Sequence, residues 1–262
     1  MTSNSLAGRI GLVTGASAGI GEAILRSLVA AGCGVVANAR REARLAELAA
    51  EIGPRVASAA GDCADDAVIT RMLDTARDSF GGRSKDADLI VVNAGRGLNG
   101  SVMTSDTSQW EEMIRTNLLG AAKLIRAAGH RMLKATEGLA GPALVGSPRD
   151  IIVIGSTVGR HVSPFSSMYG STKFGLHGLV EGARRELGPK GIRVTLIEPG
   201  FVESEFQGVA GYDPKWVAEV FERIGPVLQP DDVARLVTFV ASQPPQVHVN
   251  DIMIRPTRQD YP

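Results

Sequence analysis

Cysteine is scarce in this chain, and its charges balance. Only two cysteines, Cys33 and Cys63, occur in 262 residues, and neither has another Cys or His nearby at metal-ligand spacing. These features exclude a disulfide framework and a structural zinc site, and we expect a reducing, cytoplasmic location. Lys plus Arg and Asp plus Glu number 28 each, so electrostatics give no reason to expect nucleic acid or an anionic membrane as a partner.

Long apolar runs are also missing. No uninterrupted apolar stretch reaches the roughly 18 residues of a membrane span, and the first residues do not combine a basic stretch with an apolar core as secretory signals do. Aromatic residues make up 5% of the chain, against 44% hydrophobic and 21% charged residues, which is a globular composition. We expect a single domain over residues 1–262 and no association with membranes.

Short apolar runs rich in Val and Ile alternate with segments of helical period, which is typical of βαβ units. The expected strands lie near residues 10–13, 34–37, 56–59, 89–92, 151–154, 194–197 and 252–254. The expected helices cover residues 22–31, 41–52, 67–80, 108–134, 168–187 and 230–242. Because most strands are continuously apolar, we predict an α/β fold, a doubly wound seven-stranded parallel sheet with helices on both faces. Residues 136–149 and 203–230 are rich in Gly and Pro and are expected to be loops, the second placed to act as a lid.

A glycine-rich turn follows the first expected strand and leads into the first expected helix. Its sequence, TGASAGIG at residues 14–21, spaces three glycines as Gly-x-x-x-Gly-x-Gly. Such a turn lets backbone N–H groups approach a pyrophosphate, whose charge the positive end of the helix dipole stabilises. The alternative is a tight turn that binds nothing.

The second expected strand leads into two arginines. Arg40 stands where a site for NAD would place an acidic residue on the ribose 2′-hydroxyl. Guanidinium groups suit a 2′-phosphate, so the sequence favours NADP(H) over NAD(H), with Arg40 as the first candidate ligand and Arg41 as the second. Alternatively, both arginines only begin an exposed helix.

Tyr169 and Lys173 stand four residues apart in an expected helix and therefore share one face. An ammonium beside a phenol favours the phenolate, which suits the tyrosine to general acid or base catalysis. Ser156 follows the expected strand at 151–154, at the sheet edge where ligands bind, and its hydroxyl could donate to a carbonyl oxygen. The alternatives are a solvated helix face and an ordinary turn serine.

Several motifs together resemble one family. TGASAGIG at 14–21, VNAG at 92–95, Asn117, Ser156, YGSTK at 169–173 and PG at 199–200 occur in the order of the short-chain dehydrogenase/reductase family. The resemblance extends from about Leu6 to the C-terminus. It implies a Rossmann fold, a nicotinamide cofactor and hydride transfer to or from a small carbonyl or alcohol substrate. Residues 39–42 and 250–259 are similar to the subgroup of NADP-dependent 3-hydroxy acid dehydrogenases and clavulanate dehydrogenase.

The resemblance also implies roles for four catalytic residues. Tyr169 would exchange a proton with the substrate oxygen, which Ser156 would hold. Lys173 would lower the pKa of the tyrosine and bind the nicotinamide ribose. Asn117 would position a water molecule in the proton relay.

Further residues are implied as cofactor ligands besides Tyr169 and Lys173. Those expected around the pyrophosphate and 2′-phosphate are Gly15, Ser17, Gly19, Ile20, Gly21, Arg40 and Arg41. Those expected beside the adenine and its ribose are Asp62, Cys63, Asn93, Ala94 and Gly95. Those expected at the nicotinamide are Pro199, Gly200, Val202 and Ser204, with backbone groups of Val202 bonded to the carboxamide. No metal is expected, because the histidines lack ligand spacing.

Other interpretations remain open. The chain could be a catalytically silent NADP(H)-binding sensor of the same fold, or a 3-oxoacyl carrier-protein reductase, although its tail lacks the Asp-Gly-Gly common in those reductases. The resemblance implies a homodimer or homotetramer. The substrate pocket is expected to involve residues 96–99, 158–165 and 201–227, where Arg160 or His161 could meet a carboxylate.

Overall fold

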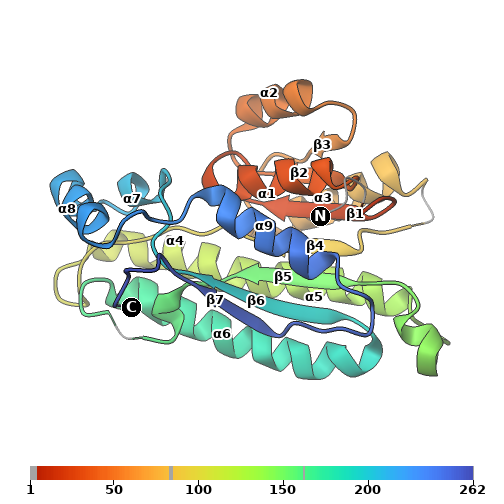
Figure 1. Cartoon of the computed structure of the whole chain (residues 1–262). Helices are drawn as coiled ribbons and strands as arrows, with labels where there is room; N and C mark the ends of the chain where they lie inside the picture. Colours follow the sequence, from red (N-terminus) through yellow and green to blue (C-terminus); the bar gives the residue numbers. More distant parts are fainter. Residues whose placement is uncertain (1–4, 83–84, 162, 262) are drawn as a thin grey trace.

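The computed structural model describes residues 5–82, 85–161 and 163–261. Its strands form one parallel, seven-stranded sheet in the order β3-β2-β1-β4-β5-β6-β7 (Figure 1). The strands are β1 (Ile10–Thr14), β2 (Gly34–Asn38), β3 (Val56–Ser58), β4 (Leu89–Val92), β5 (Asp150–Ile154), β6 (Arg193–Pro199) and β7 (Asp251–Ile254). The predicted doubly wound α/β fold is confirmed.

Helices connect the strands. The α-helices are α1 (Gly19–Ala30), α2 (Glu42–Ile52), α3 (Asp66–Phe80), α4 (Trp110–Ile114), α5 (Ala121–Lys134), α6 (Ser167–Leu187), α7 (Phe206–Val209), α8 (Pro214–Ile224) and α9 (Pro230–Ala241). Short 3₁₀ turns are η1 (Thr107–Gln109), η3 (Gly141–Val145), η4 (Thr157–Gly159) and η5 (Gly188–Lys190), and η2 (Arg115–Gly120) is a π-helix. Within the described ranges, no helix is long and apolar enough to cross a membrane.

Two apolar layers cover the sheet, because successive strand residues point to opposite faces. On one face, α1, α2 and α9 bury side chains such as Leu28, Leu48 and Val237 against β1, β2 and β4. On the other face, α3, α5 and α6 do the same with side chains such as Met72 and Leu124. Helices therefore shield both faces of the sheet from water, and this agrees with the continuously apolar sequences of most strands.

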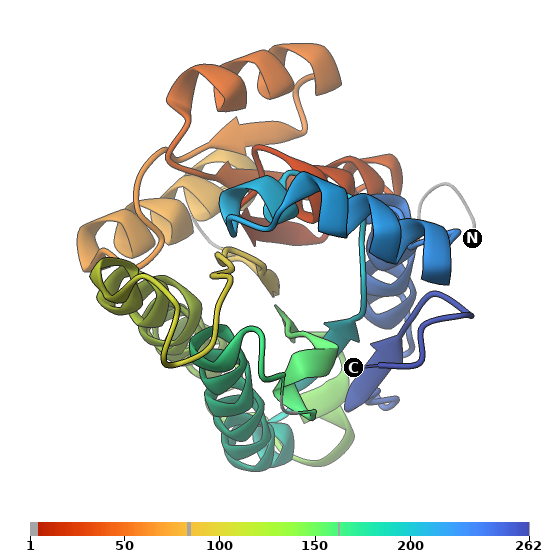
Figure 2. The same cartoon turned by 90° about the vertical axis from the view of Figure 1, so that its left-hand side faces the viewer.

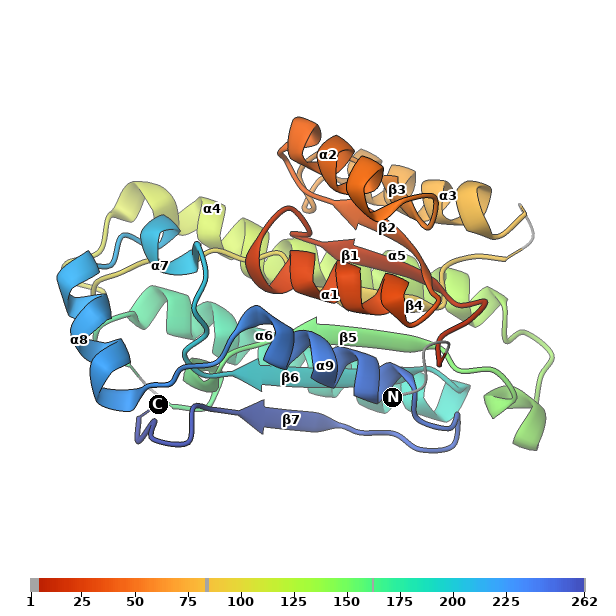
Figure 3. The ribbon, with the colours of Figure 1, turned by 45° about the horizontal axis from the view of Figure 1, so that its top comes forward.

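The strands all point toward the end of the molecule where α7 and α8 lie (Figure 3). Seen from that end, the segment that contains α7 and α8, drawn in light blue, lies across the edge of the sheet (Figure 2). The carboxyl ends of the strands and the 203–230 segment thus face each other, as a ligand site of this architecture requires.

One expectation was wrong: the 203–230 segment, expected to be a loop, contains α7 and α8. The helix expected over 108–134 is present as α4, η2 and α5, with a π turn at η2 in its middle. The expected 136–149 loop includes the 3₁₀ turn η3. In α8 the proline is a start signal: Pro214 lies in the first turn, where no N–H bond is lost, and the Asp213 carboxylate accepts from Lys215 N–H at 2.8 Å.

A buried ionic cluster joins the amino ends of β1, β5 and β6. The Asp150 carboxylate is fully buried and accepts hydrogen bonds from Arg9 at 2.9 Å and from Arg193 at 2.7 and 2.9 Å. Arg9 also donates to Asp88 at 2.7 Å. Each guanidinium is almost completely shielded from solvent, so Asp150 compensates charges that water does not reach.

We expect Asp150→Ala to destabilise the protein by about 3–5 kcal/mol, because the substitution leaves two buried guanidinium groups without their shared partner. Urea denaturation at neutral pH would measure this loss. Glu47→Ala is the matched control, since Glu47 pairs with Arg44 at the surface and its removal should leave the midpoint nearly unchanged. Equal effects of the two substitutions would contradict the assignment.

Candidate active site

A cavity of about 450 Å³ opens at the carboxyl ends of β1, β4, β5 and β6. Its floor is the glycine-rich turn, its walls are the ends of these strands and α6, and its cover is the α7–α8 segment. The predicted site residues that line it are Gly15, Gly19, Ile20, Gly21, Asn93, Ala94, Gly95, Ser156, Tyr169, Lys173, Pro199, Gly200, Val202 and Ser204. Residues separated by almost 190 positions in the sequence thus share one cavity.

Two glycines in the turn are required by geometry. Gly15 has φ +68°, a left-handed conformation that favours glycine. At Gly21, a Cβ atom would lie 2.1 Å from the carbonyl oxygen of Gly15. The absence of both side chains lets the backbone fold back on itself in front of α1, so that the N-terminus of this helix faces the cavity.

Thr14 and Asn93 fasten this turn to the neighbouring strand. The Thr14 hydroxyl accepts hydrogen bonds from the backbone N–H groups of Asn93 and Ala94, both at 3.0 Å. In return, the Asn93 side-chain amide donates to the carbonyl oxygen of Thr14 at 2.9 Å. The carboxyl ends of β1 and β4 are therefore held at a fixed separation, and with them the two walls of the cavity.

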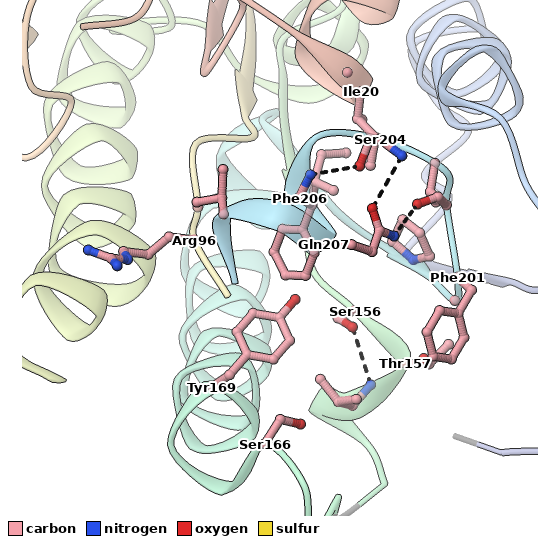
Figure 4. Close-up of a pocket in the computed structure, with 18 of the residues that line it drawn as sticks. Ile20, Arg96, Ser156, Thr157, Ser166, Tyr169, Phe201, Ser204, Phe206 and Gln207 are labelled. Atoms are coloured by element: carbon pink, nitrogen blue, oxygen red, sulfur yellow. Dashed lines mark hydrogen bonds between the residues drawn. The ribbon is translucent and has the colours of Figure 1, made fainter. Parts of the chain in front are cut away.

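Ser156 and Tyr169 lie on one side of the cavity (Figure 4), which Lys173 also lines. Ser156 begins the 3₁₀ turn after β5, and its hydroxyl accepts from Val158 N–H at 3.4 Å. The Lys173 ammonium donates to the carbonyl oxygen of Ile154 at 3.1 Å and lies 5.8 Å from the centre of the Tyr169 ring. The three predicted reacting groups are thus brought together by β5 and α6.

Burial has the largest effect on the pKa values of Tyr169 and Lys173. It raises the pKa of the Tyr169 phenol above its ordinary value, while the Ser156 hydroxyl acts in the opposite direction. Burial also lowers the pKa of Lys173 from 10.5 to about 8. The lysine was expected to lower the pKa of the tyrosine. In this structure burial outweighs that effect, because a site shielded from water disfavours both the phenolate and the ammonium.

Asn117 lies behind the cavity wall and does not line it. Its side chain accepts from Arg96 N–H at 2.8 Å and donates to the Arg96 carbonyl at 2.9 Å and to the Thr172 hydroxyl at 3.0 Å. These bonds join the loop after β4 to the turn of α6 that holds Tyr169. The residue lies in the π turn η2, an irregularity that is frequent at functional sites.

The two candidate phosphate ligands differ in position. The Arg41 guanidinium donates to the hydroxyl and the carbonyl oxygen of Ser17 at 3.1 and 3.2 Å, and to Glu205 at 3.3 Å. Arg40 is exposed and donates to Glu112 at 3.2 Å. Both arginines lie outside the cavity, and Arg41 is the one that touches the glycine-rich turn.

Asp62 and Cys63 lie after β3, also outside the cavity. The Asp62 carboxylate accepts from the Ala64 N–H at 2.8 Å and pairs with Arg115. Burial raises the pKa of the Cys63 thiol to about 11. A protonated thiol is a poor nucleophile, so this environment does not activate Cys63.

The cover of the cavity is aromatic. Phe206 packs against Tyr169 with ring centroids 5.6 Å apart, and Tyr212 stacks on Trp216 at 5.3 Å. Gln207 and Arg223 line the cavity within the expected 201–227 stretch, although neither was named individually. Thr157, Ser166 and Tyr261 line it from outside every expected pocket stretch, and no local signal in the sequence marks them.

Two expectations for the pocket were wrong. Arg160 does not line the cavity but pairs with Glu198 at 2.6 Å and with Asp251. His161 does not line it either, and its ring lies 3.0 Å from Arg255. Both side chains turn toward β6 and β7, where carboxylates or the C-terminal segment bind them. Position 162 of the expected 158–165 stretch lies outside the described residues.

Comparison with known proteins agrees with this geometry. A family profile described as short chain dehydrogenase matches residues 9–214. The chain belongs to this family. Dehydrogenase/reductase SDR family member 11 of Bos taurus is 35% identical to this short-chain dehydrogenase, over 96% of the chain and 97% of the relative. Serine 3-dehydrogenase of Agrobacterium fabrum is 32% identical, over 95% and 94%.

A solved structure is similar over nearly the whole chain. The closed form of serine dehydrogenase complexed with NADP+ superposes with a TM-score of 0.84, at 33% identity and over 96% of both chains. The family resemblance and the Rossmann-type fold deduced from the sequence are confirmed, and with them the assignment to a family of oxidoreductases.

Lys173 gives the site a pH signature. A lysine that is more acidic in the folded state than in the unfolded state binds fewer protons there between about pH 8 and pH 10.5, so stability rises with pH across this window. We expect wild type to gain about 3 kcal/mol relative to Lys173→Met over this range. Denaturation curves of both proteins at pH 7, 9 and 10.5 would measure it, and parallel pH profiles would contradict it.

Proposed function

We propose that this short-chain dehydrogenase is an NADP(H)-dependent oxidoreductase that transfers a hydride between nicotinamide and a carbonyl or secondary alcohol, with Tyr169 as general acid and base. One observation supports this most strongly: the glycine-rich turn and the Ser156, Tyr169 and Lys173 side chains line the same cavity. A binding site for a dinucleotide and a proton donor within one enclosed space are what such a reaction requires.

The residues present fit a dinucleotide. A Cβ at Gly21 would fill the turn below α1, so the glycines keep backbone N–H groups accessible to a pyrophosphate. Gly15, Ser17, Gly19, Ile20 and Gly21 would hold the phosphates; Asp62, Cys63, Asn93, Ala94 and Gly95 the adenosine; and Pro199, Gly200, Val202 and Ser204 the nicotinamide. When bound, the cofactor supplies or accepts the hydride.

The chain's own residues handle the proton. Because burial raises the pKa of Tyr169, the phenol holds its proton at neutral pH and can donate it to the oxygen of a carbonyl substrate. Ser156 faces the same space and would donate a hydrogen bond to that oxygen. The Lys173 ammonium would stabilise the phenolate left behind, and Asn117 would order a water molecule of the relay. In the oxidising direction the same groups act in reverse.

The preference for NADP(H) over NAD(H) rests on the two arginines. No carboxylate follows β2 directly, and Arg41 already contacts Ser17 of the turn. The similar serine dehydrogenase structure is described as complexed with NADP+. We propose Arg40 and Arg41 as ligands of the 2′-phosphate, since guanidinium groups make charge-assisted bonds to phosphate oxygens.

Further parts of the proposal concern the surroundings of the site. We propose the 203–230 segment as a lid, because α7 and α8 cover the cavity. A cytoplasmic location and self-association as a dimer or tetramer are also proposed. The exposed apolar side chains of Leu119 in η2 and Phe174 in α6 are compatible with pairing through the helices that carry Asn117 and Tyr169. The substrate is a small carbonyl or alcohol compound.

Tyr169→Phe tests the chemistry. The substitution keeps the ring that packs against Phe206 but removes the transferable proton, so we expect turnover to fall by about 10²–10⁴ while NADPH affinity stays close to that of wild type. Fluorescence titration would give the affinity, and NADPH oxidation with a panel of aldehydes and ketones would give the rate.

Three results would redirect the assignment. Full activity of Tyr169→Phe would remove Tyr169 from the mechanism. Tight NADPH binding without turnover on any carbonyl compound would favour a catalytically silent NADP(H)-binding sensor. Turnover confined to acyl carrier-protein thioesters would identify a 3-oxoacyl carrier-protein reductase.

Arg41→Ala tests cofactor choice. We expect NADPH to bind about ten- to a hundredfold more weakly to this variant, because charge-assisted hydrogen bonds to the 2′-phosphate are lost, while NADH affinity changes little. Arg40→Ala is the matched comparison, and its effect should be smaller because the Arg40 side chain points toward Glu112. A wild-type preference for NADH in paired titrations would refute both arginines as ligands.

A further inference from the structure

The side-chain amide of Gln207 occupies backbone hydrogen-bonding groups on the wall of the cavity. Its Nε2 donates to the carbonyl oxygen of Val202 at 2.7 Å, and its Oε1 accepts from the Ser204 N–H at 3.3 Å (Figure 4). We propose that Gln207 is an internal competitor of the cofactor: its carboxamide occupies the place of the nicotinamide carboxamide and must leave when the cofactor binds. The inference rests on the proposed function.

The backbone at Val202 explains why a carboxamide fits there. Val202 forms a parallel bridge with Leu228, in which the Phe201 carbonyl accepts from Leu228 N–H at 3.1 Å and the Glu203 N–H donates to the Leu228 carbonyl at 2.9 Å. In a parallel bridge, the N–H and C=O of the bridged residue itself point to the opposite side. For Val202 that side is the cavity, which it lines together with Ser156 and Tyr169.

The chemical match is specific. A primary carboxamide offers an NH₂ donor and a carbonyl acceptor close together, which complements a backbone carbonyl beside a backbone N–H. Gln207 presents this group from within the chain, and nicotinamide carries the same group on its ring. Because both amides would approach the Val202 carbonyl from the same side, we infer that they compete for this place.

Gln207 also fixes the segment that covers the reacting tyrosine. It belongs to α7, whose first residue, Phe206, packs on Tyr169. The same ring closes against the loop after β4, since a Cβ at Gly97 would lie 2.5 Å from Phe206. Release of the Gln207 amide would remove one hydrogen bond that holds α7 to the cavity wall, while the Phe206 N–H keeps its bond to the Ser204 hydroxyl at 3.3 Å.

Internal competition lowers the apparent affinity for the cofactor, because only the fraction of molecules with a released Gln207 can bind the carboxamide. Gln207→Met removes both hydrogen bonds and keeps the length of the side chain. We expect the Kd of NADPH to fall about three- to tenfold in this variant. This fold-change corresponds to the net free energy of one hydrogen bond that no longer has to be broken. Isothermal titration calorimetry with the full-length protein would measure it.

A cofactor fragment tests whether the effect lies at the carboxamide. 2′-Phospho-ADP-ribose contains the adenosine, its 2′-phosphate, the pyrophosphate and the second ribose but no nicotinamide, so its Kd should be the same for Gln207→Met and wild type. Gln243→Met is the matched control. The Gln243 amide also donates to a backbone carbonyl, that of Phe239 at 2.9 Å, but does not line the cavity, and its loss should leave the Kd of NADPH unchanged.

Other outcomes would overturn the inference. Weaker or unchanged NADPH binding by Gln207→Met would show that the amide supports the cofactor site or is irrelevant to it. Equal tightening toward NADPH and the fragment would show a general loosening of the cover. In contrast, failure of wild type to bind NADPH and the fragment would refute the proposed function itself. Thermal melting of each variant would verify that it is folded.

Discussion

The hydrogen bonds between Thr14 and the residues after β4 are the constraint on which the site depends. The Thr14 hydroxyl accepts from two consecutive N–H groups, and the Asn93 amide returns a bond to the Thr14 carbonyl. These bonds fix the carboxyl ends of β1 and β4. Beyond this point the two strands turn away from each other, so no further hydrogen bonds of the sheet join them. The glycine-rich turn and the loop at Arg96 both start from this junction. Asn117 is positioned by the same loop, because its side chain bonds to the backbone of Arg96.

A second constraint is the shielding of charge. Tyr169 and Lys173 are both buried, so the site favours the neutral phenol and weakens the hold of the lysine on its proton. Neither the phenolate of Tyr169 nor the ammonium of Lys173 is favoured unless a group of opposite charge forms beside it. A negative oxygen formed beside the ammonium would meet a preorganised, poorly solvated cation, and this is the arrangement that stabilises charge as it appears rather than before.

Much of this architecture could be predicted from the sequence, and the failures have physical causes. Apolar strand runs and the glycine spacing depend on local patterns, which is why the sheet and the turn were predicted correctly. The helices of the expected lid were missed because Pro214 and its neighbouring glycines resemble helix breakers, although a proline in the first turn begins a helix. Arg160 belonged to the expected 158–165 pocket stretch, and the sequence could not show that it pairs with Glu198, 38 residues away on β6. Such pairings are set by tertiary structure and leave no local signal.

The π turn at η2 has a consequence for the evolution of the chain. A π turn accommodates one residue more than the α-helical hydrogen-bonding pattern allows, so everything after Gly120 is offset by one position from a regular helix. One residue corresponds to about 100° of helical rotation. The stripe of α5 that faces the sheet, including Leu124 and Ala128, is therefore in register only because of the extra residue. Deletion of a single residue from this segment would turn the stripe toward solvent, so the spacing between Trp110 and Leu124 should resist length changes that surface loops of the same protein accept.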